Sequence, residues 1–168
     1  MRSRVEHLVG EDAGKMWVGT FHSTAVKILR RDAHRIGIVP SFVIFDEDDT
    51  RAALRRVLDD LKLDQKRYPV AALSKAISAA KNELKGPADY EKNNTDFFGA
   101  RISEVYRLYQ RRLKEFDAME FDDLIGNYVM LLEKNDAIRA ELHGRLRHRP
   151  NDEKQGPNHA QYHPHQPA

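Results

Sequence analysis

Apolar residues recur every three or four positions along most of the chain between residues 25 and 146, which is the period of an amphipathic α-helix. The pattern is clearest at Leu54, Val57, Leu58 and Leu61. Further stripes of this period predict helices over residues 22–36, 69–84, 98–116, 121–132 and, in a weaker form, 138–146. We therefore expect a mainly α fold, a helical bundle in which these stripes are buried against one another.

Two short segments have the character of strands. Residues 16–20 are apolar and rich in β-forming residues, which predicts a short buried strand that leads through a polar turn into the first helix. Residues 42–45 form a brief apolar run that fits either a strand or a buried connector. The polar stretch 88–95 predicts a linker, and the segment after Leu146, rich in Arg, Pro and His, predicts a disordered tail.

Helix ends are also marked in the sequence. Gly37 followed by Pro40 predicts the end of the first helix, since glycine favours the left-handed conformation that closes a helix. Asp46, with Asp49 three residues later, predicts an acid-rich helix start.

Composition excludes some classes of protein. The chain has no cysteine, so it can form neither a disulfide framework nor a thiolate metal site. No apolar run approaches the roughly 20 residues that cross a bilayer, and the first residues lack the apolar centre of a signal peptide. We therefore expect a cytoplasmic protein with no membrane partner. The 28 basic and 26 acidic residues nearly cancel, so bulk charge does not argue for nucleic acid.

The first predicted helix carries a local basic face. Its cations recur at helical spacing, and locally only Asp32 opposes them: Lys27, Arg30, Arg31, His34 and Arg35. Thr20, His22 and Ser23 stand at the start of the same helix, where free N–H groups, hydroxyls and cations together suit phosphates. The pattern predicts a nucleic-acid contact, and the alternative is an ordinary solvated surface. Phe21 fits either base stacking or the core.

Other polar groups have two interpretations each. Lys81 and Asn82 end an Ala-rich helix, where a cation complements the helix dipole. Glu120, Asp122 and Asp123 open a helix, which favours capping over a carboxylate metal site. The tail contains four histidines, but no predicted structure would hold them around a metal: His148, His159, His163 and His165. Neither G-x-G-x-x-G nor G-x-x-x-x-G-K-[ST] occurs, so we predict no ATP-phosphate loop and no resident metal in this chain.

Several segments together resemble the UvrD/PcrA/Rep group of superfamily 1 DNA helicases. They lie in the family's order and spacing over roughly residues 1 to 146: Met16–Ser23, Ile28–Arg31, Ile77–Leu84, Val105–Leu113 and Phe121–Ile125. The resemblance implies three parts. Residues 1–24 would be a remnant of the RecA-like domain 1A, residues 25–146 the α-helical domain 1B, and residues 147–168 a degenerate Walker B region with the tail.

The resemblance also implies roles for individual residues. Thr20, Phe21, His22 and Ser23 would lie along the single-stranded DNA track, with Lys81 and Asn82 closer to the duplex. Phe121, Asp122 and Asp123 belong to the segment where the insertion returns to the ATPase domain. In the family the Walker A loop precedes this region, and Walker B carboxylates follow it.

The Walker B region departs from the family's pattern. Asp152, Glu153, Gln155 and Asn158 fall in the family's register. The preceding apolar strand is replaced by Arg-Pro-Asn, however, and Pro157 interrupts the motif, which removes a ladder donor. No intact catalytic residue is therefore expected. ATP and Mg²⁺ are cofactors of the full-length family and not of this chain alone.

The sequence therefore predicts a fragment of an ATP-dependent 3′ to 5′ DNA helicase, cytoplasmic and nucleoid-associated. It would bind single-stranded DNA or single-strand/duplex junctions without hydrolysing ATP, and its partners would be DNA and the missing helicase domains. The alternatives are a stand-alone helical protein-interaction module, or a non-functional remnant that folds poorly.

Overall fold

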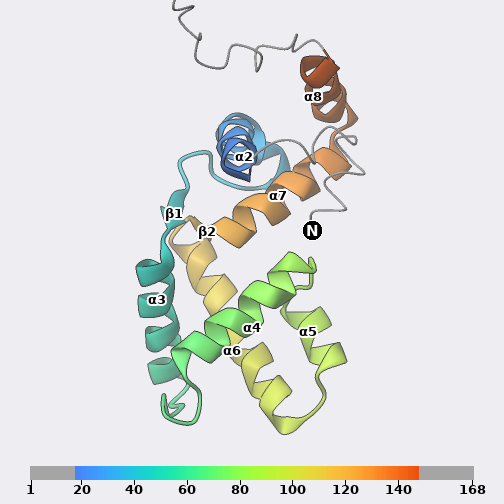
Figure 1. The fold of residues 1–168 in the computed structure, drawn as a ribbon. Coiled ribbons are helices and arrows are strands. Elements are labelled where there is room, and N and C mark those ends of the chain that lie inside the picture. The colour runs from blue at the N-terminus through green and yellow to red at the C-terminus, as the bar shows by residue number, and fades with distance from the viewer. Residues whose placement is uncertain (1–17, 148–168) are drawn as a thin grey trace, which may run out of the picture.

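A computed structural model describes residues 18–147 of the chain, and within this range it is mainly α-helical, as predicted (Figure 1). The elements in order are α2 (Val18–Asp32), the 3₁₀ helix η2 (Ala33–Ile36), β1 (Val43–Phe45), α3 (Glu47–Asp60), α4 (Val70–Asn82), α5 (Pro87–Asn93), α6 (Phe97–Glu115), β2 (Ala118–Glu120), α7 (Phe121–Lys134) and α8 (Asp136–Arg147). None of the helices in the described range has both the length and the apolar character needed to cross a bilayer.

The helices pack around two hydrophobic clusters, which lie at opposite ends of the molecule in Figure 1. The first cluster joins α2, η2, α7 and α8 and includes Leu29, Phe42, Leu124 and Leu132. The second joins α3, α4 and α6 and includes Leu54, Leu73, Ile77 and Tyr109. The apolar stripes that predict these helices therefore do form the cores.

A two-stranded parallel sheet lies between the two clusters. β1 pairs with β2 in the register Val43 with Ala118 and Phe45 with Glu120. Successive side chains of a strand point to opposite faces, and here Ala118 belongs to the second cluster whereas Met119 belongs to the first. The two faces of the sheet thus contribute side chains to different hydrophobic clusters. Of the two structures that the sequence allowed for residues 42–45, a strand or a buried connector, the strand is correct for β1. The strand β2 was not predicted.

The start of the chain differs from the expectation. Helix α2 begins at Val18, so the predicted strand over residues 16–20 is wrong from Val18 onward, and Met16 and Trp17 lie outside the described residues. A strand needs a neighbour to bond its backbone groups, whereas a helix bonds its own. Within the described range the two strands pair with each other, in a sheet of only two strands, and α2 satisfies its backbone internally.

Two further expectations are corrected. The polar stretch 88–95 does not form a simple linker, because α5 covers most of it, with Pro87 in its first turn, a position that proline tolerates well. The stripe of α6 is shorter than predicted: Phe98 and Phe116 are 44% and 57% exposed. Both lie at ends of the helix and outside the buried core, although the Phe98 ring still stacks on Tyr68 of the second cluster, with centroids 5.4 Å apart.

The predicted helix ends are confirmed. Gly37 has a left-handed φ of 75°, and its N–H donates to the carbonyls of Ala33 and His34 in η2. Asp46 caps α3 by accepting a 2.8 Å bond from the Asp49 N–H, and the Asp49 side chain accepts from the Asp46 N–H. This reciprocal capping box fixes the point where β1 turns into α3.

Candidate nucleic-acid interface

The start of α2 meets the start of α7 at the surface. The rings of His22 and Phe121 contact edge to face, with centroids 5.9 Å apart and planes at 72°. Phe121 is 55% exposed, although its place in an apolar stripe predicted burial. Ser23 is also exposed, and Thr20 and Phe21 lie in the first turns of the same helix. Two of the candidate segments are therefore adjacent in space.

The basic face of α2 and η2 is exposed along its length: Lys27, Arg30, Arg31, His34 and Arg35. Its arginines are nevertheless engaged within the protein. The Arg30 guanidinium donates to the carbonyls of Pro40 and Phe42, at 2.9 and 2.5 Å, and lies 4.0 Å from the centre of the Phe42 ring. Arg30 thereby braces the loop that leads into β1.

Arg31 and Arg35 have acidic partners. Arg31 makes a bidentate pair with Glu141 of α8, at 3.0 and 2.9 Å, and also bonds Asp32. These bonds raise the pKa of Arg31 above its usual range and lower that of Glu141. Arg35 lies 3.5 Å from Asp32. Asp32 thus opposes the cations locally, as expected, and α8 brings a second acid, Glu141, to this face.

Lys81 lies inside the protein. Its ammonium forms ion pairs with Glu120 and, at 3.0 Å, with Asp123, and its side chain is only 4% exposed. It also lies 5.2 Å from the centre of the Tyr109 ring. The DNA contact expected of Lys81 does not fit this position. Asn82, the last residue of α4, is exposed.

Glu120 is the centre of this buried cluster. Besides Lys81, its carboxylate accepts hydrogen bonds from the Tyr109 hydroxyl at 2.7 Å and the Thr50 hydroxyl at 3.3 Å. Burial, and next the Glu120 charge, raise the pKa of Tyr109 far above its ordinary value. The Asp123 carboxylate accepts from the Glu120 N–H at 3.3 Å, which confirms the capping interpretation of these acids.

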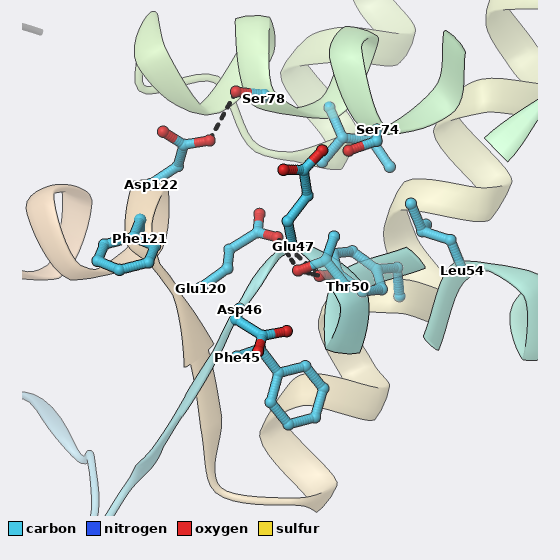
Figure 2. A pocket seen from close by; sticks show the side chains of 12 residues that line it. Phe45, Asp46, Glu47, Thr50, Leu54, Ser74, Ser78, Glu120, Phe121 and Asp122 are labelled. Carbon is cyan, nitrogen blue, oxygen red and sulfur yellow. Dashed lines mark hydrogen bonds between the residues drawn. The ribbon is translucent and has the colours of Figure 1, made fainter. Parts of the chain in front are cut away.

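A pocket of about 150 Å³ opens beside the cluster, between α3, α4 and the start of α7 (Figure 2). Glu120 and Asp122 approach it from one side and Asp46 and Glu47 from another. Asp122 accepts a 2.6 Å hydrogen bond from Ser78 of α4. Among the described residues, no three His, Asp or Glu side chains are grouped as a metal site would need. The candidate residues Asp152, Glu153, Gln155 and Asn158 and the four tail histidines lie outside the described range.

Sequence reasoning missed the donors that surround Glu120. Thr50 and Tyr109 lie in apolar helical stripes, where their hydroxyls give no separate signal. The one available clue is that a hydroxyl in a buried stripe needs a partner. That clue does not name the partner, because the bonding elements are distant in sequence.

Taken with this architecture, comparison with known families defines the class of the protein. A family model described as the UvrD/REP helicase N-terminal domain matches residues 1–166. The chain belongs to this family, as the motif resemblance predicted.

Individual relatives are more specific. The chain is 43% identical over 162 residues to the ATP-dependent DNA helicase PcrA of Staphylococcus epidermidis, and 41% identical to that of Staphylococcus aureus. In each case the match covers 96% of this chain and 22% of the relative. The chain thus spans about a fifth of the length of these PcrA helicases.

Proposed function

We propose that this chain provides a DNA-contacting part of a PcrA-type, ATP-dependent 3′ to 5′ DNA helicase. The observation that carries the proposal is the meeting of His22 with Phe121, since each belongs to one of the motifs shared with the family. An exposed aromatic ring beside a helix N-terminus can stack on a base while free N–H groups bind a phosphate. Single-stranded DNA offers both an unpaired base and a phosphate.

The cations divide into two kinds. Lys27 is exposed, and no carboxylate among the described side chains pairs with it, so it is the leading phosphate contact of α2. Arg30, Arg31 and Arg35 already hold carbonyls or carboxylates, and they add positive potential more than direct contacts. The track therefore runs from the start of α2, with Thr20 to Ser23, along Lys27, whereas Asn82 lies on α4, at the side expected to face duplex.

We propose a division into domains that the packing supports. A boundary at residue 24 falls inside α2 (Val18–Asp32), whose Ala25 and Leu29 pack with α7 and α8. We therefore assign the first cluster to the RecA-like domain 1A and the second, built on α3, α4 and α6, to domain 1B. The sheet formed by β1 and β2 is the connection between them.

We propose further that this chain alone does not hydrolyse ATP. Hydrolysis requires a phosphate-binding loop, a positioned Mg²⁺ and a finger residue together. The sequence contains no Walker A pattern, and its Asp152, Glu153 and Gln155 are set among prolines. In a full-length parent, other domains would supply ATP and Mg²⁺ binding.

Fluorescence anisotropy with a labelled single strand across a salt series tests the DNA contact. Affinity should fall as salt rises, and Lys27→Glu should weaken binding and reduce the slope of log affinity against log salt by about 0.7 for the lost phosphate contact. Lys75→Glu, an equally exposed cation on α4, is the matched control and should change neither. Equal effects of the two variants would contradict the proposed track. Absent binding by a cooperatively folded chain would favour the helical protein-interaction module.

A further inference from the structure

We propose that Glu120 is a positioning residue for the DNA contact. Its carboxylate, held by three helices of the second cluster, fixes where Phe121 lies and therefore where Phe121 meets His22. The inference rests on the proposed function. It adds to the contacting residues, His22 and Phe121, the carboxylate that positions them.

The hydrogen bonds around Glu120 come from every helix of the second cluster. Thr50 is on α3, Lys81 on α4 and Tyr109 on α6, and each donates to the same carboxylate. Glu120 is 8% exposed, and among the described residues no buried side-chain polar atom lacks a hydrogen-bond partner. A fully satisfied buried network of this kind has one preferred geometry.

The strand register explains why Glu120 lies there. Ala118 and Glu120 share one face of β2, because side chains alternate along a strand, and Ala118 packs in the second cluster. Phe121 is the next residue and the first of α7. The backbone that carries the exposed ring is therefore fixed one residue earlier by a buried carboxylate.

Little else holds the Phe121 ring. It is 55% exposed and belongs to neither hydrophobic cluster. On the other side of Phe121, Asp122 accepts a hydrogen bond from Ser78 of α4, a helix of the second cluster, as Figure 2 shows. Both neighbours of Phe121 thus bond to the second cluster, whereas its contact His22 lies on α2, which packs in the first. The residues of α7 from Leu124 onward also pack in the first cluster, so Phe121 lies where the two clusters join.

Nuclear magnetic resonance of the His22 ring protons tests the inference directly, because an edge-to-face neighbour shifts those resonances. Phe121→Ala defines the resonance position without the ring. Glu120→Gln keeps the shape of the side chain but removes the charge that Lys81 pairs with, and should move the His22 resonances toward the Phe121→Ala position. Ser78→Ala removes the half-buried bond to Asp122, together with a long, exposed bond from Asn82, and should shift the resonances in the same direction. This variant serves as the test if Glu120→Gln does not fold.

A stability-matched control separates positioning from folding. Leu73→Ala removes a core side chain of the second cluster that makes no hydrogen bond to the Glu120 carboxylate, so it should lower the melting temperature without moving the His22 resonances. Single-strand affinity should fall about tenfold in Glu120→Gln, the loss expected when one stacked ring leaves its base. Unchanged His22 resonances in folded Glu120→Gln, or an equal shift in Leu73→Ala, would overturn the inference. The resonance test also stands if the chain binds no DNA, in which case the proposed function fails separately.

Discussion

Replacing Lys81 by methionine should destabilise this chain more than most single substitutions. Methionine keeps the length and apolar stem of the lysine side chain and removes its charge, so packing changes little. The side chains of Lys81 and its partner Glu120 are 4% and 11% exposed, respectively. Removing one partner of such a pair leaves a buried charge uncompensated, which costs about 3–5 kcal/mol. Because domains of this kind are stable by only about 5–15 kcal/mol, the loss is a large share of the total.

The hydrogen bonds that Glu120 keeps limit how much Lys81→Met destabilises the chain. After Lys81→Met, Glu120 still accepts from Tyr109 at 2.7 Å and from Thr50 at 3.3 Å, which keeps the expected cost near the lower bound of about 3 kcal/mol. Adding Glu120→Gln removes the more buried of the two carboxylates that lose Lys81, and leaves Asp123, which keeps its hydrogen bond from the Glu120 N–H. The double variant should therefore be more stable than Lys81→Met alone, with a coupling energy of about 1–3 kcal/mol between the two positions.

Urea unfolding followed by circular dichroism measures these free energies, with each variant extrapolated to water. Lys75→Met is the matched control, since Lys75 lies on the same helix but is exposed, and its free energy of unfolding should change by less than about 0.5 kcal/mol. A loss below about 1 kcal/mol for Lys81→Met would refute the reasoning, because it would place the pair in the range of a solvated ion pair. A double variant that is no more stable than Lys81→Met alone would also refute the reasoning.

Two other predictions concern packing and titration. A Cβ added at Gly99 would lie 2.5 Å from the Asn94 carbonyl and 2.7 Å from Asp96, so Gly99→Ala should cost about 1–3 kcal/mol. Gly144→Ala meets nothing within 4 Å and should stabilise helix α8 by up to about 1 kcal/mol, and thermal melts of the two variants should move in opposite directions. Burial raises the pKa of three tyrosines well above the ordinary value: Tyr106, Tyr109 and Tyr128. They stay protonated in the folded chain while the unfolded chain loses those protons above pH of about 10, so stability is intact below that pH and falls above it by about 1.4 kcal/mol per pH unit for each tyrosine. Tyrosinate absorbance should rise together with the loss of helical dichroism, and ionisation of all tyrosines in a chain that stays helical would contradict this.

The helices could be predicted because their determinants are local. The stripe at Leu54, Val57 and Leu58 and the capping pair Asp46 and Asp49 lie within a few turns of one another, and both formed as expected. The strand β2 could not be predicted, since three residues are too few to show alternation and its partner β1 is far away in the sequence.

The polar contacts were the least predictable part of the candidate site. A lysine is exposed by default, and Lys81 is buried only because β2 and α7 bring two carboxylates to it. In the same way, Asp32 was the only acid expected near Arg31, and the fold places Glu141 of α8 beside it as well. Motif resemblance identified the family and marked the segments that matter, but it gave no contact between them. The meeting of His22 and Phe121 required the fold.

Because the two faces of the sheet belong to different clusters, Lys81→Met should destabilise the second cluster more than the first. Ala118 and Glu120 face the second cluster and Met119 the first, so the uncompensated carboxylate left by the substitution lies on the side of α3, α4 and α6. The first cluster loses no hydrogen bond and no apolar contact of its own. Amide hydrogen exchange should therefore accelerate more in α3, α4 and α6 than in α2 and α8, because sub-global opening follows the locally weakened unit. Uniform acceleration would instead mean that the sheet couples the two clusters into one cooperative unit, and that Glu120 stabilises both alike.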